Sequence, residues 1–154
     1  EESDLPEVQR QLVRVGYTKF GGFLLGGMEE WSNKALPLAY LPQMTVVEVA
    51  GAKPGSLQVL DVRTPQEWEG GHVPGATYIF LPELEGKLGR LKKDRPVAVY
   101  CDSGYRASIA ASLLRRHGFT QVRNVPGSWK AWKAAGLKAE VPKGRKKASD
   151  TGRA

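Results

Sequence analysis

The chain of 154 residues contains a single cysteine, Cys101, within the stretch Y-C-D-S-G-Y-R-A-S at 100–108. An apolar run leads into this stretch and a helix-like pattern follows it. If the loop curls, its backbone N–H groups can converge on the sulfur, and Gly104 gives the freedom to curl. The first N–H groups of the following helix and the charge of Arg106 would also stabilise an anion there. The stretch therefore predicts a reactive thiolate or persulfide rather than an inert buried thiol.

Strands and helices alternate around this loop. The patterns predict strands at 58–62, 76–80, 96–100 and 121–125. They predict helical segments at 45–51, 65–69, 82–91, 105–117 and 128–135. Such alternation indicates an α/β domain with a mainly parallel sheet. In such sheets active sites lie beyond the carboxyl ends of the strands, which is where Cys101 falls.

Three motifs, in order between residues 58 and 140, resemble the rhodanese family of sulfurtransferases. They are L-D-V-R-T-P-Q-E-W-E-G-G-H-V-P-G-A at 60–76, C-D-S-G-Y-R-A-S at 101–108 and P-G-S-W-K-A-W at 126–132. The resemblance implies the fold of that family, a five-stranded parallel sheet flanked by helices on both faces. This fold agrees with the alternation of elements.

The resemblance also implies a role for each residue of the loop. Cys101 would take a sulfane sulfur from thiosulfate or from a persulfide such as glutathione persulfide, and a thiol or cyanide would then accept it. No cofactor takes part in this scheme. The substrate-binding loop would comprise Asp102, Ser103, Gly104, Tyr105 and Arg106. Arg106 suits an anionic donor and the acidic Asp102 opposes one, so the donor stays open.

The first motif adds Arg63 as a further substrate-binding candidate. Its structural alternative is an ion pair with Asp61, Glu67 or another carboxylate, and this alternative is favoured. For His72 we expect a turn-stabilising role near the site, because an already activated thiolate needs no histidine base. With one cysteine and two histidines far apart in the sequence, we expect no metal site.

Two other functions use the same residues. Cysteine phosphatases place five residues between the cysteine and the arginine, whereas four separate Cys101 from Arg106. The shorter loop should fit sulfur better than phosphate, so a phosphatase or arsenate reductase is the minor alternative. Many rhodanese-like domains are regulatory units, and a sulfur-carrier or regulatory module of a larger fusion is the main alternative.

Residues 16–38 resemble a later segment of the same chain. Three pairs coincide, Gly26 with Gly127, Trp31 with Trp132 and Leu36 with Leu137. We therefore expect residues 1–40 to be the C-terminal end of a rhodanese-like repeat without cysteine, and 44–140 to be a complete domain. This order resembles fusions in which a metallo-β-lactamase-like persulfide dioxygenase or hydrolase carries rhodanese repeats.

The net charge of +7 is concentrated at the end of the chain. Residues 138–154 hold six basic and two acidic side chains, and we expect 141–154 to be a basic flexible tail that aids solubility, with nucleic-acid binding as the disfavoured alternative. Because no apolar run is long enough to span a membrane, no membrane partner is expected. A lone cysteine fits a reducing compartment, so we expect a cytoplasmic protein.

Overall fold

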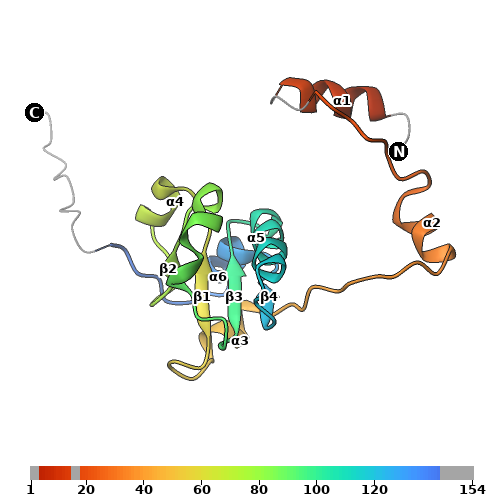
Figure 1. The fold of residues 1–154 in the computed structure, drawn as a ribbon. Coiled ribbons are helices and arrows are strands. Elements are labelled where there is room, and N and C mark those ends of the chain that lie inside the picture. Colours follow the sequence, from red (N-terminus) through yellow and green to blue (C-terminus); the bar gives the residue numbers. More distant parts are fainter. Residues whose placement is uncertain (1–3, 15–17, 143–154) are drawn as a thin grey trace, which may run out of the picture. The chain divides into compact units, whose positions relative to one another are not determined.

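The computed structural model describes residues 4–14 and 18–142, and the chain divides into two compact units, 1–40 and 41–154 (Figure 1). Among the described residues, all strands belong to the second unit. None of the helices there combines the length and the apolar character needed to cross a membrane. Most of the tail predicted for 141–154 lies outside the described residues.

Four parallel strands form one sheet in the order β2-β1-β3-β4. Their bounds are Gln58–Asp61 for β1, Thr77–Tyr78 for β2, Val97–Tyr100 for β3 and Val122–Asn124 for β4. All of β3 is buried, as expected for a central strand of a sheet covered on both faces. The register sets Asp61 opposite Tyr100 at the carboxyl ends of β1 and β3.

The prediction of a five-stranded sheet was wrong by one strand. Beside β4, a single parallel bridge joins Gln43 to Asn124, and no further strand forms there among the described residues. The Met44 N–H donates to the Asn124 carbonyl at 3.0 Å, and the Asn124 N–H donates to the Pro42 carbonyl at 2.9 Å. The pairing stops there because Pro42 has no N–H to donate and Thr45 already caps the next helix.

Helical segments cover both faces of the sheet. The α3 and α6 helices pack on one face with Ala98 and Tyr100 of β3. The α5 helix and two 3₁₀ segments pack on the other face with Val97 and Val99. The bounds are Val46–Ala50 for α3, Tyr105–Arg116 for α5, Ser128–Ala134 for α6, Leu81–Glu83 for η2 and Glu85–Arg90 for η3. Alternate side chains of one strand thus separate the core into two layers.

The α4 helix, Pro65–Glu69, has the bounds that the sequence predicts. Thr64 caps it, and Glu67 completes a capping box with that threonine. The helix predicted for 82–91 is instead the pair of 3₁₀ segments, with a non-helical residue at Lys87. Gly86 and Gly89 lie in this stretch, and glycine disfavours a continuous α-helix.

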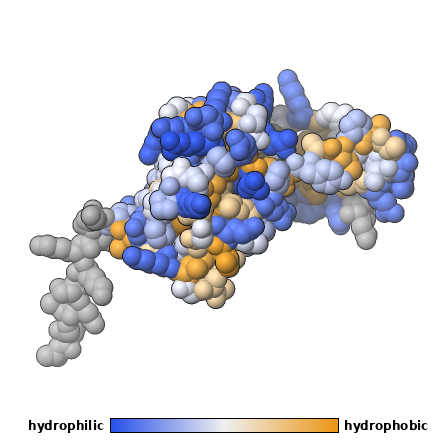
Figure 2. Space-filling model, turned by 90° about the horizontal axis from the view of Figure 1, so that it is seen from below, coloured by the Kyte–Doolittle hydropathy of each residue, from blue (hydrophilic) through white to orange (hydrophobic). Residues whose placement is uncertain are grey.

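The first unit consists of α1, Leu5–Arg14, and α2, Gly27–Asn33, and neither helix buries a residue. Large apolar side chains are exposed on it. Figure 2 shows hydrophobic residues as orange patches among hydrophilic ones on the molecular surface.

Candidate active site

Cys101 lies directly after β3, at the ends of the strands that point to the top of Figure 1. The residue is buried, with 1% of its surface exposed. The Gly104 N–H donates to Cys101 Sγ at 3.1 Å. Gly104 adopts φ 117° and caps α5, so the loop reverses direction at the residue that contacts the sulfur. The predicted curl of the loop around Cys101 is therefore present.

Ser128 supports the loop from the opposite side, and sequence reasoning missed it. Its hydroxyl accepts the Cys101 N–H at 3.1 Å and donates to the Val125 carbonyl at 2.7 Å. Its backbone has φ 47°, an uncommon conformation for a residue with a side chain. The next N–H, that of Trp129, donates to the Cys101 carbonyl at 3.0 Å. The start of α6 thus fixes the backbone of Cys101 on both sides.

Arg106 forms a two-bond ion pair with Glu67 of α4. The guanidinium donates to both carboxylate oxygens, each at 2.7 Å. This pairing holds the pKa of Glu67 at about 2, with a smaller contribution from hydrogen bonds of Thr64. The pair raises the pKa of Arg106, and an interaction of the guanidinium with the Cys101 side chain contributes in the same direction. Glu67 therefore fixes the guanidinium of Arg106 at the start of α5.

The other loop residues differ in exposure and charge. Asp102 forms an ion pair with Lys130 of α6 at 3.1 Å, so a nearby cation offsets the acidic charge that was expected to oppose anionic donors. Ser103 and Tyr105 are exposed at the surface of the loop. Neither makes a contact with the sulfur among the hydrogen bonds described for residues 4–14 and 18–142.

Arg63 belongs to a buried network beneath the loop. Its guanidinium donates to Asp61 at 2.7 Å and to the Gly71 carbonyl at 2.7 Å. The ring of Trp129 lies 4.6 Å from the guanidinium carbon. The Tyr100 hydroxyl donates to the same carboxylate at 2.5 Å, and burial raises the pKa of Tyr100. Arg63 thus forms a buried ion pair, which is the alternative to substrate binding given above. Its partner is Asp61 and not Glu67.

His72 holds the turn that follows α4. Its ring stacks on Trp68 at 3.4 Å, and its Nδ1 lies 3.2 Å from the Trp68 carbonyl oxygen. Its backbone exchanges two hydrogen bonds with Glu140, at 2.8 and 2.9 Å. This environment fits a turn-stabilising role near the site.

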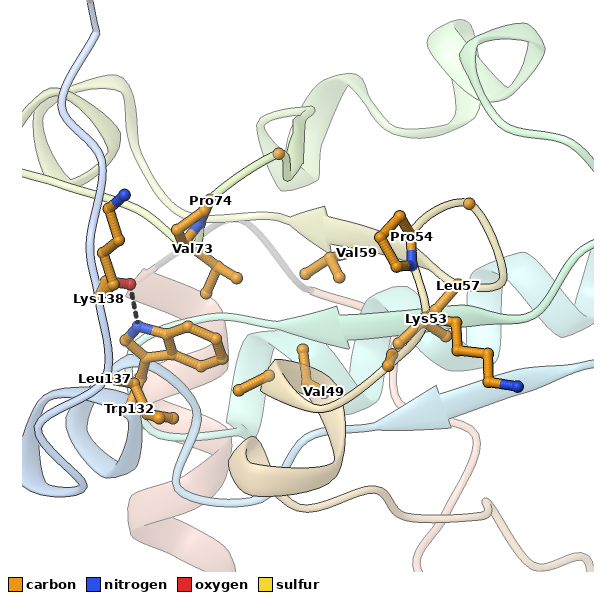
Figure 3. Close-up of a pocket in the computed structure, with 14 residues that line it drawn as sticks. Val49, Lys53, Pro54, Leu57, Val59, Val73, Pro74, Trp132, Leu137 and Lys138 are labelled. Carbon is orange, nitrogen blue, oxygen red and sulfur yellow. Dashed lines mark hydrogen bonds between the residues drawn. The ribbon is translucent and has the colours of Figure 1, made fainter.

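A cavity of about 500 Å³ lies on the α3 and α6 face of the sheet (Figure 3). Trp132, Val59 and Val73 line it, and Lys53 and Lys138 stand at its edges. Cys101 does not line it. The described residues contain no group of three His, Cys, Asp or Glu side chains placed to hold a metal ion. At the end of β3 the structure offers one buried thiol with the Gly104 N–H on its sulfur.

Comparisons with known proteins agree with this geometry. The model of the rhodanese-like domain family matches residues 48–135. A sulfurtransferase of Allochromatium vinosum is 34% identical over 86 residues, which are 56% of this chain and 80% of that protein. The uncharacterized protein YqhL of Bacillus subtilis is 41% identical over 75 residues, which are 49% of this chain and 60% of YqhL. The chain thus spans less than two thirds of YqhL.

A solved structure shows the same fold. A rhodanese-related protein from Thermoplasma volcanium superposes with a TM-score of 0.61 and 26% identity, covering 66% of this chain and 99% of the other. The segment that the family model matches, residues 48–135, includes the cysteine loop, the capped α4 helix and the start of α6. By the family model, the fold and the position of its cysteine, the chain belongs to the rhodanese-like domain family.

Proposed function

We propose that the chain is a sulfurtransferase that works through a persulfide on Cys101. The supporting observation is a buried thiol at the carboxyl end of a central strand, with the Gly104 N–H on its sulfur and Arg106 in the same loop. Both groups favour negative charge on sulfur. The similarity to a sulfurtransferase supports the same class of reaction.

The reaction has two displacements. The Cys101 thiolate attacks the sulfane sulfur of thiosulfate or of a persulfide, and a new S–S bond forms as the S–S bond of the donor breaks. The leaving group, sulfite or a thiolate, keeps the electron pair of the broken bond. A thiol or cyanide then attacks the outer sulfur of the Cys101 persulfide and regenerates the thiolate. The Gly104 N–H stabilises the thiolate at the start and at the end of the cycle.

Two ion pairs at the loop bear on the choice of donor. Glu67 occupies both terminal nitrogens of Arg106, and Lys130 offsets Asp102. An anionic donor therefore meets neither a free guanidinium nor an uncompensated carboxylate. The proposal therefore includes both thiosulfate and persulfides as donors. Either kind of donor would bind at Arg106.

Intact-mass measurement tests the proposal directly. After treatment with thiosulfate or glutathione persulfide, the chain should gain the mass of one sulfur atom, and cyanide or a thiol should remove it. Cys101 is the only thiol in the chain, so Cys101→Ser should gain none. A Cys101→Ser chain with full thiosulfate:cyanide activity would refute the mechanism. Cys101-dependent release of phosphate from an aryl phosphate would instead favour the phosphatase alternative.

The same sulfur chemistry suits a carrier module within a larger protein. A Cys101 that loads sulfur but passes it only slowly to small acceptors would favour a carrier or regulatory module of a persulfide dioxygenase or metallo-β-lactamase-like fusion. Comparing the rates of the loading and unloading half-reactions separates this alternative from an independent enzyme.

A further inference from the structure

The α2 helix of the first unit has the same capping geometry as α6 of the rhodanese domain. Each helix has seven residues and follows a left-handed glycine, Gly26 with φ 71° and Gly127 with φ 68°. A Cβ at either glycine would lie 2.7 Å from the Cβ of the residue four positions later, Glu30 or Ala131. Both helices therefore start on a glycine that no other residue can replace without rearrangement.

The two helices also end in the same way. The Trp31 indole donates to the Pro37 carbonyl at 3.0 Å, and the Trp132 indole donates to the Lys138 carbonyl at 2.9 Å. Figure 3 shows the second of these bonds as a dashed line. Each tryptophan thus holds the backbone six residues further along the chain. The acceptors of these bonds, Pro37 and Lys138, lie outside the three residue pairs that reveal the repeat in the sequence.

A third correspondence lies just after the end of each helix, at residues 35–36 and 136–137. The Leu36 N–H donates to the Trp31 carbonyl at 3.3 Å, and the Leu137 N–H donates to the Trp132 carbonyl at 3.3 Å. The residue before each leucine is left-handed, Ala35 with φ 51° and Gly136 with φ 64°. Alanine rarely adopts this conformation. The first copy thus keeps the shape of the second even where its residue type is less suited to it.

The rhodanese domain shows what such a helix covers. Trp132 is 4% exposed and packs with Ala98, Tyr100 and Val49 on one face of the parallel sheet. The first unit has no strand among its described residues, 4–14 and 18–40. Its apolar side chains stay exposed, including Leu25 at 63% and large side chains at Phe20, Phe23, Leu24, Met28, Leu36 and Leu38.

Three of the differences between the copies fall on residues that serve the catalytic loop. In α6, Ser128 accepts the Cys101 N–H, Trp129 packs on Arg63 and Lys130 pairs with Asp102. The corresponding positions of the first copy are Gly27, Met28 and Glu29. Glycine has no hydroxyl, methionine has no ring and glutamate would repel an aspartate. The glycine cap, the tryptophan and the leucine, which set the packing shape, are retained.

We infer that residues 18–40 close a second rhodanese-type parallel sheet, one that carries no catalytic loop. The partner of this apolar face is the face of such a sheet, because α6 packs its equivalent tryptophan on one. Within the second unit, α6 itself occupies the corresponding face of the sheet. The claim that the second sheet carries no catalytic loop rests on the proposed sulfur transfer. The claim that residues 18–40 pack on such a sheet does not.

A graft within the full chain tests the packing. Residues 30–36 replace residues 131–137, so that Trp31 and Leu36 take the places of Trp132 and Leu137 while Ser128 and Trp129 remain. If α2 is built for this kind of sheet, the grafted chain unfolds cooperatively with a Tm within about 10 °C of the unaltered chain. A graft of residues 8–14 from α1, which has the same length, should lower the Tm further. Alanine in place of the grafted tryptophan should do the same.

Equal loss of stability in the α1 and α2 grafts would overturn the inference. So would a discrete dimer of the unaltered chain that Trp31→Ala dissociates, because the apolar face would then pair two copies. Ser128→Gly tests the claim that the first copy is non-catalytic. It introduces glycine, the residue at the corresponding position Gly27, where the backbone is left-handed. It should leave the chain folded and slow sulfur loading of Cys101 about tenfold. Loading at the original rate would refute the non-catalytic assignment, whereas no loading by the unaltered chain would refute the proposed function alone.

Discussion

Glu67 controls how much of the charge of Arg106 is available beside the sulfur. Two hydrogen bonds of 2.7 Å join these side chains, and both residues are only partly exposed. Replacing the carboxylate with an amide removes the neutralising charge and leaves the guanidinium. We predict that Glu67→Gln lowers the KM for thiosulfate about three- to tenfold, because a dianion then meets a net cation. Steady-state kinetics at low ionic strength measure this change.

Glu69→Gln is the matched control, because it removes the other carboxylate of α4. Its KM for thiosulfate should stay within about twofold of the original value. An unchanged or higher KM in Glu67→Gln would show that the ion pair itself, rather than a free guanidinium, is the form that serves the donor.

The same carboxylate makes stability depend on pH. The hydrogen bonds of Arg106 hold the pKa of Glu67 at about 2, below its ordinary value of 4.5. A lowered pKa in the folded state gives stability that is complete above the ordinary value and is lost as the pH falls toward 2. Between pH 5 and 3, the free energy of unfolding should therefore fall more steeply in the unaltered chain than in Glu67→Gln. Urea titrations at several pH values measure it, and parallel curves would contradict the prediction.

At the scale of elements, local signals carried most of the prediction. The start of α4 follows from Thr64 and Pro65, and the end of β3 follows from an apolar run. The curl of the cysteine loop is likewise local, because the residues that make it are adjacent. The edge beside β4 was less predictable, since one proline and one helix cap decide whether a strand can extend there.

Contacts between distant segments were not predictable from the sequence. Ser128 meets Cys101 across 27 positions, and Arg106 meets Glu67 across 39. No spacing rule links such residues, because the fold alone decides which strand ends and helix starts adjoin. The G-S-W signal around Ser128 lay within a recognised motif, but nothing in the sequence tied its hydroxyl to the cysteine.

Gly104 joins the loop to α5, and its backbone conformation is the feature to test. A Cβ there would meet its nearest atoms at 3.7 Å, which is ordinary contact, so any cost comes from φ 117° and not from a clash. We predict that Gly104→Ala lowers the free energy of unfolding by about 1–2 kcal/mol and slows sulfur loading. Gly86→Ala is the control, because no atom lies within 4 Å of its Cβ position and its φ is not left-handed. Equal effects in the two variants, measured by urea unfolding, would refute the role of backbone strain.

At the scale of the whole domain, one buried polar network links the sheet to the turn beside the site. Asp61 ends β1, Tyr100 ends β3, and Arg63 reaches the Gly71 carbonyl. The Val73 N–H donates to the Tyr100 hydroxyl at 3.1 Å. The carboxyl ends of two strands and the turn after α4 are thus fixed to one carboxylate directly beneath the cysteine loop.

Removing the charge of that carboxylate should cost more than removing any neutral member of the network. Arg63 is 1% exposed, so Asp61→Asn leaves a buried cation without its counter-ion, and we predict a loss of about 3–5 kcal/mol in the free energy of unfolding. Tyr100→Phe removes one hydroxyl and leaves the Val73 N–H without its acceptor, so it should cost about 1–3 kcal/mol. Urea unfolding of both variants at neutral pH compares the two losses. A smaller loss in Asp61→Asn than in Tyr100→Phe would mean that the ring of Trp129 and the Gly71 carbonyl suffice to hold the buried guanidinium.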